Sequence, residues 1–413
     1  MKKLIYCLGV VILAMGCSQV KHQDLYSKVI DAADNQYKKV LALNSDVTKV
    51  PRTLYDDGKL KTVNIYNWTS GFFAGNLWYM YDLTKKEEWK NEAIRWTEAL
   101  DTIQYWSGNH DVGFMIYCSY GNALRLTQDK KYEQVVINTA ESLSKRYSDT
   151  VKCIKSWNYR KAWDGKTEWF YPVIIDNMMN LELLYEASKL SGNNKYRDIA
   201  TQHAMTTMKN HYRDDYSCVH VVDYDKTTGE VLDKATCQGF TDESSWARGQ
   251  SWGLYGYTLC YRETKNPEFL KFAENIANYI MTYPTIPEDK IPFWDYNVDQ
   301  DGFTPEWKYD ASKYAEPLRD VSAATIAASA LLELSTYVED GAKYYNYAND
   351  VLKNVASDEY MASKDENFYF LLKHSVGSIP HGGDVDKPVN YADYYYLEAL
   401  CRKKMIDEGK KLF

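Results

Sequence analysis

The chain has 413 residues, of which 45% are hydrophobic and 26% are charged, a balance typical of a globular protein with a large core. Its formal net charge is −8 and it has no basic tract, which argues against a nucleic-acid partner. It holds 37 tyrosines and 12 tryptophans, and such an excess of aromatic residues favours carbohydrate contacts, although it also suits a packed interior.

The first 16 residues resemble a bacterial export signal. Two lysines precede an apolar run over residues 4–15, which is too short to span a membrane and remain there. The run ends in small residues directly before Cys17, as in a lipoprotein processing site. We therefore expect a signal peptide over 1–16, lipidation at Cys17, a tether over 17–24, and an exported, periplasmic protein anchored to the outer membrane of a Gram-negative bacterium. An ordinary secretory signal is the alternative.

The eight cysteines form no CxxC pair and no cysteine–histidine pattern, so a zinc site is not indicated. Cys118, Cys260 and Cys401 fall in apolar stretches and are expected to be buried thiols. In an oxidising compartment, a bridge between Cys218 and Cys237 could form.

Six apolar stretches alternate with amphipathic ones along the chain. The apolar stretches begin at Trp68, Asp111, Asp176, Trp246, Asp320 and Tyr391. Amphipathic helices are expected over residues 25–43, 87–104, 131–147, 194–212, 267–283 and 342–357. This pattern predicts one all-α domain over 25–413, an (α/α)6 barrel with the apolar helices inside. An open solenoid is the alternative, but its end repeats should carry polar faces, and the last apolar stretch is as aromatic as the others.

Long connections precede several of the apolar helices, over residues 150–170, 213–241, 284–319 and 360–390. Because the inner helices of such a barrel are parallel, these loops should gather at one mouth and carry function. Val219–Tyr224 and Glu230–Asp233 are expected to pair there as a small hairpin.

The segment 236–257 places Trp246 and Trp252 on either side of Arg248. It contains Asp-Glu-Ser-Ser, which favours a helix start. Flat aromatic faces and a bidentate cation suit a sugar ring that carries a carboxylate. An aromatic core helix with one capped end is the alternative interpretation.

Asp111 and Asp176 open neighbouring inner helices, so their carboxylates should face each other across the mouth, as general acid/base chemistry on sugars requires. Each could instead be a helix cap, as Asp320 could. Asp111 follows His110 in a polar cluster, and an apolar run before Asp176 should desolvate it. Burial and the neighbouring like charge should raise a carboxylate pKa, while Arg248 and the helix N-termini should lower it. We predict a coupled pair that retains one proton near neutral pH.

Five segments together resemble glycoside hydrolase family 88, the unsaturated glucuronyl hydrolases. They are NWTSGFFAGNLWYMY, HDVGFM, IIDNMMNL, WARGQSWGLYGY and ADYYYLEAL, in the family's order and spacing. The resemblance covers nearly the whole mature chain and implies an (α/α)6 barrel. It also implies hydration of the C4=C5 bond of a terminal unsaturated uronic acid: a proton adds at C4, water adds at C5, and the resulting hemiketal opens and releases the second sugar. No metal or organic cofactor is implied.

The resemblance assigns residues as well. The family's principal acid/base aspartate matches Asp176, and its partner matches Asp111. Positions that surround the substrate match Trp68, His110, His220, Gln238, Trp246, Arg248 and Trp252, and Arg248 or His220 is expected to bind the substrate carboxylate. Ser375 and Ser378 match a Ser-x-x-Ser-x-Lys stretch of members that act on sulfated chondroitin. The lysine of that stretch is missing here, which places 6-sulfated substrates in question.

Chondroitin, hyaluronan and heparin or heparan disaccharides remain open as substrates. An unsaturated rhamnogalacturonyl hydrolase, with the same fold and chemistry on pectin fragments, is an alternative. Another is a non-catalytic glycan-binding lipoprotein. A sugar epimerase on the same barrel would require histidines at several inner helices, and only His110 is so placed.

Overall fold

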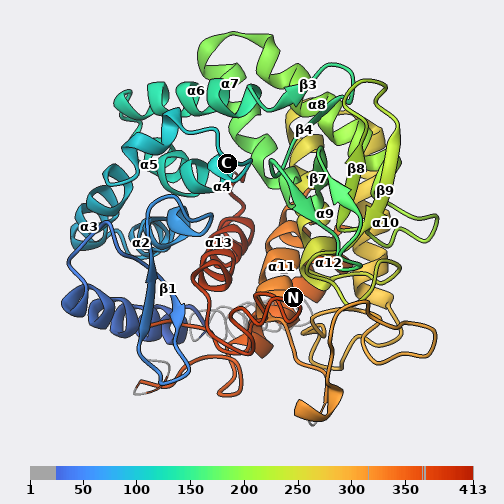
Figure 1. The fold of residues 1–413 in the computed structure, drawn as a ribbon. Helices are drawn as coiled ribbons and strands as arrows, with labels where there is room; N and C mark the ends of the chain where they lie inside the picture. Colours follow the sequence, from blue (N-terminus) through green and yellow to red (C-terminus); the bar gives the residue numbers. More distant parts are fainter. Residues whose placement is uncertain (1–24, 315, 365, 367–368, 413) are drawn as a thin grey trace, which may run out of the picture.

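The computed structural model describes residues 25–314, 316–364, 366 and 369–412. Within these residues the chain forms a ring of helices (Figure 1). The signal peptide expected over 1–16, the lipidation site expected at Cys17 and the tether expected over 17–24 lie outside the described residues. No helix within the described ranges is long and apolar enough to cross a lipid bilayer.

Six helical segments of the described chain form the inner wall of the ring. They are α2 (Ser70–Thr84), a run of α4 (Val112–Ile116), η2 (Tyr117–Gly121) and α5 (Asn122–Thr127), a run of η3 (Ile175–Asn180) and α7 (Leu181–Ser191), α9 (Ala247–Thr264), α11 (Val321–Ser335) and α13 (Asn390–Asp407). α2, α9, α11 and α13 are buried along most of their lengths. α13 packs against both α11 and α2, so the last inner helix closes the ring onto the first. The predicted (α/α)6 barrel is confirmed, and an open solenoid is excluded.

Amphipathic helices cover the outside of the ring. They are a helix over residues 25–43, α3 (Glu87–Glu98), α6 (Lys131–Ser144), α8 (Asn194–Asn210), α10 (Pro267–Thr282) and α12 (Gly341–Val355). α10 buries Phe269 and Ile280 on one face, and the Asn266 side chain caps its first turn by accepting from Glu268 N. The predicted positions agree closely with the structure except in α3, which ends early and is followed by the 3-10 helix η1 (Asp101–Tyr105).

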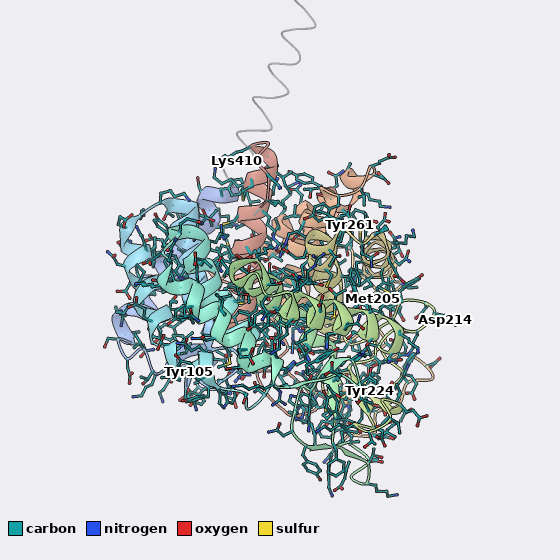
Figure 2. The ribbon with its side chains drawn as sticks, turned by 90° about the horizontal axis from the view of Figure 1, so that it is seen from above. Tyr105, Met205, Asp214, Tyr224, Tyr261 and Lys410 are labelled. Atoms are coloured by element: carbon teal, nitrogen blue, oxygen red, sulfur yellow. The ribbon has the colours of Figure 1, made fainter. Side chains whose placement is uncertain are left out.

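The inner helices point the same way along the ring axis. Figure 2 shows Tyr261, near the end of α9, and Lys410, after α13, on one side of the molecule, with Tyr105 and Tyr224 on the opposite side. Tyr105 ends η1, which leads into α4, so this second side carries the N-terminal ends of the inner helices. The loops that precede these helices therefore share one mouth, as expected.

A three-stranded antiparallel sheet lies beside the mouth, with strand order β7 (Pro172–Ile174), β8 (Val221–Tyr224) and β9 (Val231–Ala235). The β8–β9 hairpin confirms the predicted one, whereas β7 was expected only as an apolar run. Because η3 follows β7 directly, the sheet sets the position of Asp176 at the start of the third inner segment.

Three two-stranded hairpins complete the described strands. They are β1 (Val50–Leu54) with β2 (Leu60–Val63), β3 (Tyr147–Ser148) with β4 (Cys153–Ile154), and β5 (Arg160–Lys161) with β6 (Glu168–Trp169). The first and the last of these each contribute an arginine to the cavity described below.

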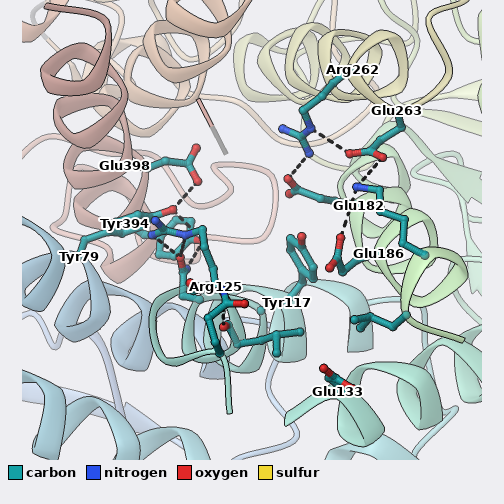
Figure 3. Close-up of a pocket in the computed structure, with 16 residues that line it drawn as sticks. Tyr79, Tyr117, Arg125, Glu133, Glu182, Glu186, Arg262, Glu263, Tyr394 and Glu398 are labelled. Atoms are coloured by element: carbon teal, nitrogen blue, oxygen red, sulfur yellow. Dashed lines mark hydrogen bonds and ion pairs between the residues drawn. The ribbon is translucent and has the colours of Figure 1, made fainter. Parts of the chain in front are cut away.

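A buried charge network joins the inner helices at the end opposite the mouth. Arg262 pairs with Glu182 of α7 (Figure 3). It also lies 3.1 Å from Glu333 of α11. Arg402 of α13 lies 3.0 Å from Glu333 and 3.4 Å from Glu398. A cavity of about 260 Å³ adjoins this network, and the charged groups drawn in its wall are largely paired with one another. The network therefore links four inner helices, α7, α9, α11 and α13, and we assign it a structural role.

The six cysteines of the described chain are all free. Cys118, Cys260 and Cys401 are buried, as expected. The bridge considered between Cys218 and Cys237 is not formed, because the first thiol packs in the main core and the second in a separate small cluster against the sheet.

The Asp-Glu-Ser-Ser stretch does not cap α9, which corrects the expectation from sequence. Trp246 occupies the N-cap position without a side-chain hydrogen bond. The free amide of Ala247 donates instead to the Trp294 carbonyl at 3.0 Å, and Asp242 accepts from the backbone of Thr236. A carbonyl from a distant loop thus supplies the acceptor that a local side chain was expected to supply.

Candidate active site

A cavity of about 280 Å³ opens at the mouth of the barrel. Its wall consists of Arg52, Trp68, Asp111, Trp157, Arg160, Ile174, Asp176, Cys237, Gln238, Arg248, Gly377, Ser378, His381, Gly383 and Tyr391. Six of the eleven site residues expected from the sequence lie in this wall, namely Trp68, Asp111, Asp176, Gln238, Arg248 and Ser378. Segments that are far apart in the chain therefore meet in one space, and both predicted acids belong to it.

Neither of these two acids caps its helix. Asp111 stands at the N-cap position of α4 but accepts no capping hydrogen bond, and Asp176 lies inside η3. Asp320, in contrast, accepts from Ser322 N at 3.0 Å and caps α11. The cap interpretation therefore holds for Asp320 and fails for Asp111 and Asp176.

Asp176 faces an imidazole whose tautomer is set by the backbone. Its Oδ2 lies 3.6 Å from His220 Nε2. The amides of Cys237 and Gln238 donate to His220 Nδ1 at 3.0 and 3.2 Å. Because Nδ1 accepts, the proton of the neutral ring sits on Nε2, toward the carboxylate. Burial holds the pKa of His220 well below its usual value, so this ring is a neutral donor.

Asp111 has a partner of the same kind. His110 Nε2 lies 3.2 Å from Asp111 Oδ1. Asn180 accepts from Phe114 N through its Oδ1, so its amide nitrogen, 3.2 Å from His110 Nδ1, donates to that ring. His110 therefore also presents an Nε2–H to its carboxylate, and burial lowers the pKa of His110 to about 3.

The pKa values of both acids lie above the ordinary range, in the direction expected. Burial and then the charge of Asp176 raise the pKa of Asp111 to about 7, while Arg146 lowers it. Burial raises the pKa of Asp176 to about 6, against the lowering effect of Arg248. Since the carboxylates repel each other, they titrate as a pair that retains one proton near neutral pH.

Arg248 is held by contacts within the protein. Its Nη1 lies 3.0 Å from Asp320 Oδ2 and also donates to Val376 O, and its Nη2 donates to Gly377 O at 2.6 Å. The guanidinium lies 4.5 Å from the centre of the Trp246 ring. Most of its donors are therefore committed, and its expected role as the ligand of a substrate carboxylate stays a prediction.

Five expected site residues lie behind the cavity wall instead of in it. They are His110, His220, Trp246, Trp252 and Ser375. The Trp246 ring lies 4.8 Å from that of His220, and Trp252 packs edge-on against Phe114 and Tyr395. These five side chains are buried behind the wall in this structure, and their expected contacts with substrate stay predictions.

Nine wall residues were not singled out from the sequence as site residues, and five of them carry charged or aromatic side chains, namely Arg52, Trp157, Arg160, His381 and Tyr391. Arg160 lies 4.9 Å from the Trp157 ring and contacts His381, whose Nδ1 is 2.6 Å from Ser378 Oγ. For Trp157, Arg160 and His381 the available signal was the abundance of tryptophan, tyrosine and glycine in the long loops 150–170 and 360–390, which marks a region but no single residue.

The three arginines of the wall differ in their partners. Arg52 pairs with Asp384 at 2.7 Å, and Arg248 pairs with Asp320. Arg160 has no carboxylate within 4.0 Å in the part of the chain that the structure describes. Among the wall arginines, Arg160 is therefore the one whose charge is least neutralised by carboxylates of the protein, and it is best placed to bind an anionic group that enters the cavity.

Several buried polar atoms beside the cavity lack a hydrogen-bond partner among the described residues, including Asp176 Oδ2, His220 Nε2, Trp252 Nε1 and Tyr391 Oη. Such atoms are uncommon in protein interiors, and those beside the cavity can pair with a polar molecule that binds there. Over the same residues, no group of three or more metal-ligating side chains is placed to hold a metal ion.

Comparison with known proteins agrees with this site. Residues 44–395 match the model of Glycosyl Hydrolase Family 88. An unsaturated glucuronyl hydrolase of Formosa agariphila is 40% identical, over 98% of this chain and 99% of its own. An unsaturated chondroitin disaccharide hydrolase of Streptococcus agalactiae is 32% identical, over 83% of this chain and 82% of its own.

A crystal structure of an unsaturated glucuronyl hydrolase specific for heparin superimposes with a TM-score of 0.86 at 46% identity, covering 93% of this chain and 98% of that one. A variant of the Streptococcus agalactiae enzyme in complex with dGlcA-GalNAc6S gives a TM-score of 0.73 at 29% identity, covering 91% and 90%. The barrel, the paired acids and these matches together show that the chain belongs to glycoside hydrolase family 88.

Proposed function

We propose that this protein is a hydrolase that removes the terminal 4,5-unsaturated uronic acid from glycosaminoglycan oligosaccharides produced by polysaccharide lyases. The observation that carries the proposal is the pair of acids, Asp111 (largely buried) and Asp176 (buried), which share one cavity and each face a neutral imidazole N–H. Membership of family 88 and the relatives named above support the same reaction.

The reaction requires one proton to be delivered and one to be recovered. The protonated acid of the pair gives its proton to C4 of the vinyl ether, and the ring oxygen stabilises the cation that forms at C5. Water then attacks C5 while a carboxylate takes the proton that the water loses, so the pair ends with the proton it began with. The C5 hemiketal opens, the anomeric carbon becomes a hemiacetal, and its breakdown releases the second sugar.

The protein's own groups suit these steps. By resemblance Asp176 acts as the principal acid and base, with Asp111 as its partner. The imidazoles of His220 and His110 stay neutral near pH 7, so they orient the carboxylates without competing for the proton. Carboxylate separation does not decide between retention and inversion here, because the reacting carbon is not the anomeric one.

The direct test follows the ultraviolet absorbance of the conjugated C=C bond after a lyase-generated disaccharide is added. The absorbance should fall with the wild-type protein, and Asp176→Asn should reduce turnover by about 10²–10⁴-fold while the disaccharide still binds. A non-catalytic glycan-binding protein would bind the sugar and leave the absorbance unchanged. Turnover at the wild-type rate in Asp176→Asn would remove Asp176 from the mechanism.

We propose heparin-type disaccharides as the preferred substrates, over chondroitin disaccharides that carry a 6-sulfated galactosamine. Pro380 stands where members active on sulfated chondroitin carry lysine, and the hydroxyl of Ser378 is engaged by His381. The structural relative at 46% identity is specific for heparin. A panel of unsaturated heparin, hyaluronan, chondroitin and rhamnogalacturonan products should rank heparin products first. The highest kcat/KM on the pectin product would favour the rhamnogalacturonyl alternative.

We also propose that the protein is exported and lipid-anchored at Cys17, in the periplasm, on the outer membrane. The support is the sequence of the first 17 residues. Labelling with a radioactive fatty acid should mark the wild-type protein and not Cys17→Ser, and the variant should move from the membrane fraction to the soluble one. Equal labelling of both proteins would contradict the anchor.

A further inference from the structure

We propose that Asp320 is a positioning residue for the reaction: it holds the Arg248 guanidinium and, through it, the segment 375–384 that forms one side of the catalytic cavity. The inference rests on the proposed function for its kinetic consequences, and its structural consequence can be measured without substrate. Asp320 is fully buried and is not a wall residue.

The carboxylate of Asp320 divides its two oxygens between separate elements. Oδ1 accepts from Ser322 N at 3.0 Å and from Ser322 Oγ at 2.6 Å, which caps α11, and the amide of Val376 approaches it at 3.4 Å. Oδ2 lies 3.0 Å from Arg248 Nη1. A helix cap requires only Oδ1, so the contact between Oδ2 and Arg248 serves a different purpose.

Arg248 connects Asp320 to the segment 375–384. It donates to the carbonyls of Val376 and Gly377, and the segment closes on itself through Gly377 N to Asp384 O and Ser378 N to Gly383 O, both at 2.8 Å. The wall residues of this segment are Gly377, Ser378, His381 and Gly383. If the guanidinium loses its counter-ion, the two carbonyl contacts and this side of the cavity lose their anchor.

The same ion pair controls the charge beside the acid pair. The titratable groups that act on Asp176 or are acted on by it are Asp111, His220, Arg248, Cys218 and Cys237, with His110 behind Asp111. The imidazoles are neutral and the buried thiols protonated at neutral pH, so the acids and Arg248 carry the charge. Without Asp320, the positive charge of Arg248 is uncompensated and favours ionised Asp176.

The variant Asp320→Asn keeps an oxygen that can cap α11 and removes the charge. Its matched control is Glu333→Gln on the same helix, which breaks buried pairs to Arg262 and Arg402 at the far end of the barrel. Both variants should melt at lower temperature than the wild type. Only Asp320→Asn should increase hydrogen exchange at the amides of Gly377 and Ser378, and this readout needs no substrate.

The kinetics should separate the two variants as well. In Asp320→Asn the alkaline limb of the kcat profile should move to lower pH by about half a unit or more, with a higher KM, because the acid pair loses its shared proton sooner. In Glu333→Gln the profile should match the wild type. If Asp320→Asn does not fold, Asp320→Glu keeps the charge and should retain the wild-type position of the limb with a lower kcat.

Unchanged exchange at Gly377 and Ser378 in folded Asp320→Asn would overturn the positioning role, as would an equal change in Glu333→Gln. If the wild type consumes no unsaturated disaccharide, the proposed function fails, and the exchange experiment still decides whether Asp320 holds the segment.

Discussion

Three aspartates at the start of inner segments have different partners, and those partners decide what each does. Asp320 is paired with Arg248 and caps a helix, whereas Asp111 and Asp176 face neutral imidazoles and each other's charge. No arginine or lysine lies within 4.0 Å of either of these two acids in the described residues. Burial without a close cation is what makes a carboxylate protonable near neutral pH, at a cost in stability.

Because burying an ionised Asp111 lowers the stability of the folded protein, we predict that Asp111→Asn stabilises the protein in a pH-dependent way. The pKa of Asp111 in the folded protein is raised to about 7 from 3.8, so between these values the folded state binds more protons than the unfolded state and its stability falls as pH rises. At pH 8 the variant should be more stable than the wild type by about 4 kcal/mol, because a pKa change from 3.8 to about 7 is worth about 1.4 kcal/mol for each pKa unit, and near pH 4 the two should be nearly equal. Urea unfolding at both pH values measures this, and an equal difference at both would contradict it.

Arg160 gives a second prediction at this scale. Since it is the wall arginine without a carboxylate partner, Arg160→Ala should raise KM for an unsaturated disaccharide by about 10-fold or more, with a smaller change in kcat. Lys161→Ala is the matched control, because this neighbouring lysine pairs with Glu168 and does not line the cavity. An equal rise in KM for both variants would indicate a general charge effect in place of a specific contact.

At the scale of elements, α9 approaches η3 closely because glycines line the contact. A Cβ added at Gly256 would lie 2.5 Å from Met178 Cβ, and one at Gly249 would lie 3.1 Å from Ile175 Cγ2. The contact matters for function because η3 carries Asp176 and α9 carries Arg248. Small residues thus set the distance between two sides of the cavity.

Gly256→Ala tests this packing. Alanine favours a helix by about 1 kcal/mol over glycine, but overpacking against Met178 should cost about 1–3 kcal/mol, so we expect a net loss of stability. Thermal unfolding measures it, and Gly192→Ala, at an open positive-φ site after α7, is a control for strain without packing. A stabilised Gly256→Ala would show that the two segments can separate at little cost.

At the scale of the whole molecule, the ring is held at two ends by different means. The mouth is built from loops and a small sheet, while the far end is tied by the network around Arg262, Glu333 and Arg402. The catalytic cavity thus lies at the end that is built from many separate segments, while the ion-pair network keeps the opposite end rigid.

This division predicts that Glu333→Gln separates stability from activity. Removing one partner of a buried ion pair should cost about 3–5 kcal/mol, since Arg262 and Arg402 lose a shared counter-charge. The midpoint of thermal unfolding should fall clearly, while kcat/KM at 25 °C should remain close to the wild type. A large loss of kcat/KM in the folded variant would mean that the far end communicates with the mouth.

The sequence by itself determined the barrel, because apolar stretches such as 320–335 and amphipathic stretches such as 267–283 state which faces must be buried, and six alternations leave a closed ring as the natural solution. It also indicated Asp111 and Asp176, since both open inner segments and motifs around them resemble the family. Tertiary structure alone decided the rest. Side chains from distant segments decide whether an aspartate is a helix cap or a protonable acid. They also decide whether Arg248 is free or paired and whether Arg160 lines the cavity. Local sequence patterns indicate which face of a helix or strand is buried, but they do not indicate which side chains from distant segments will be in contact.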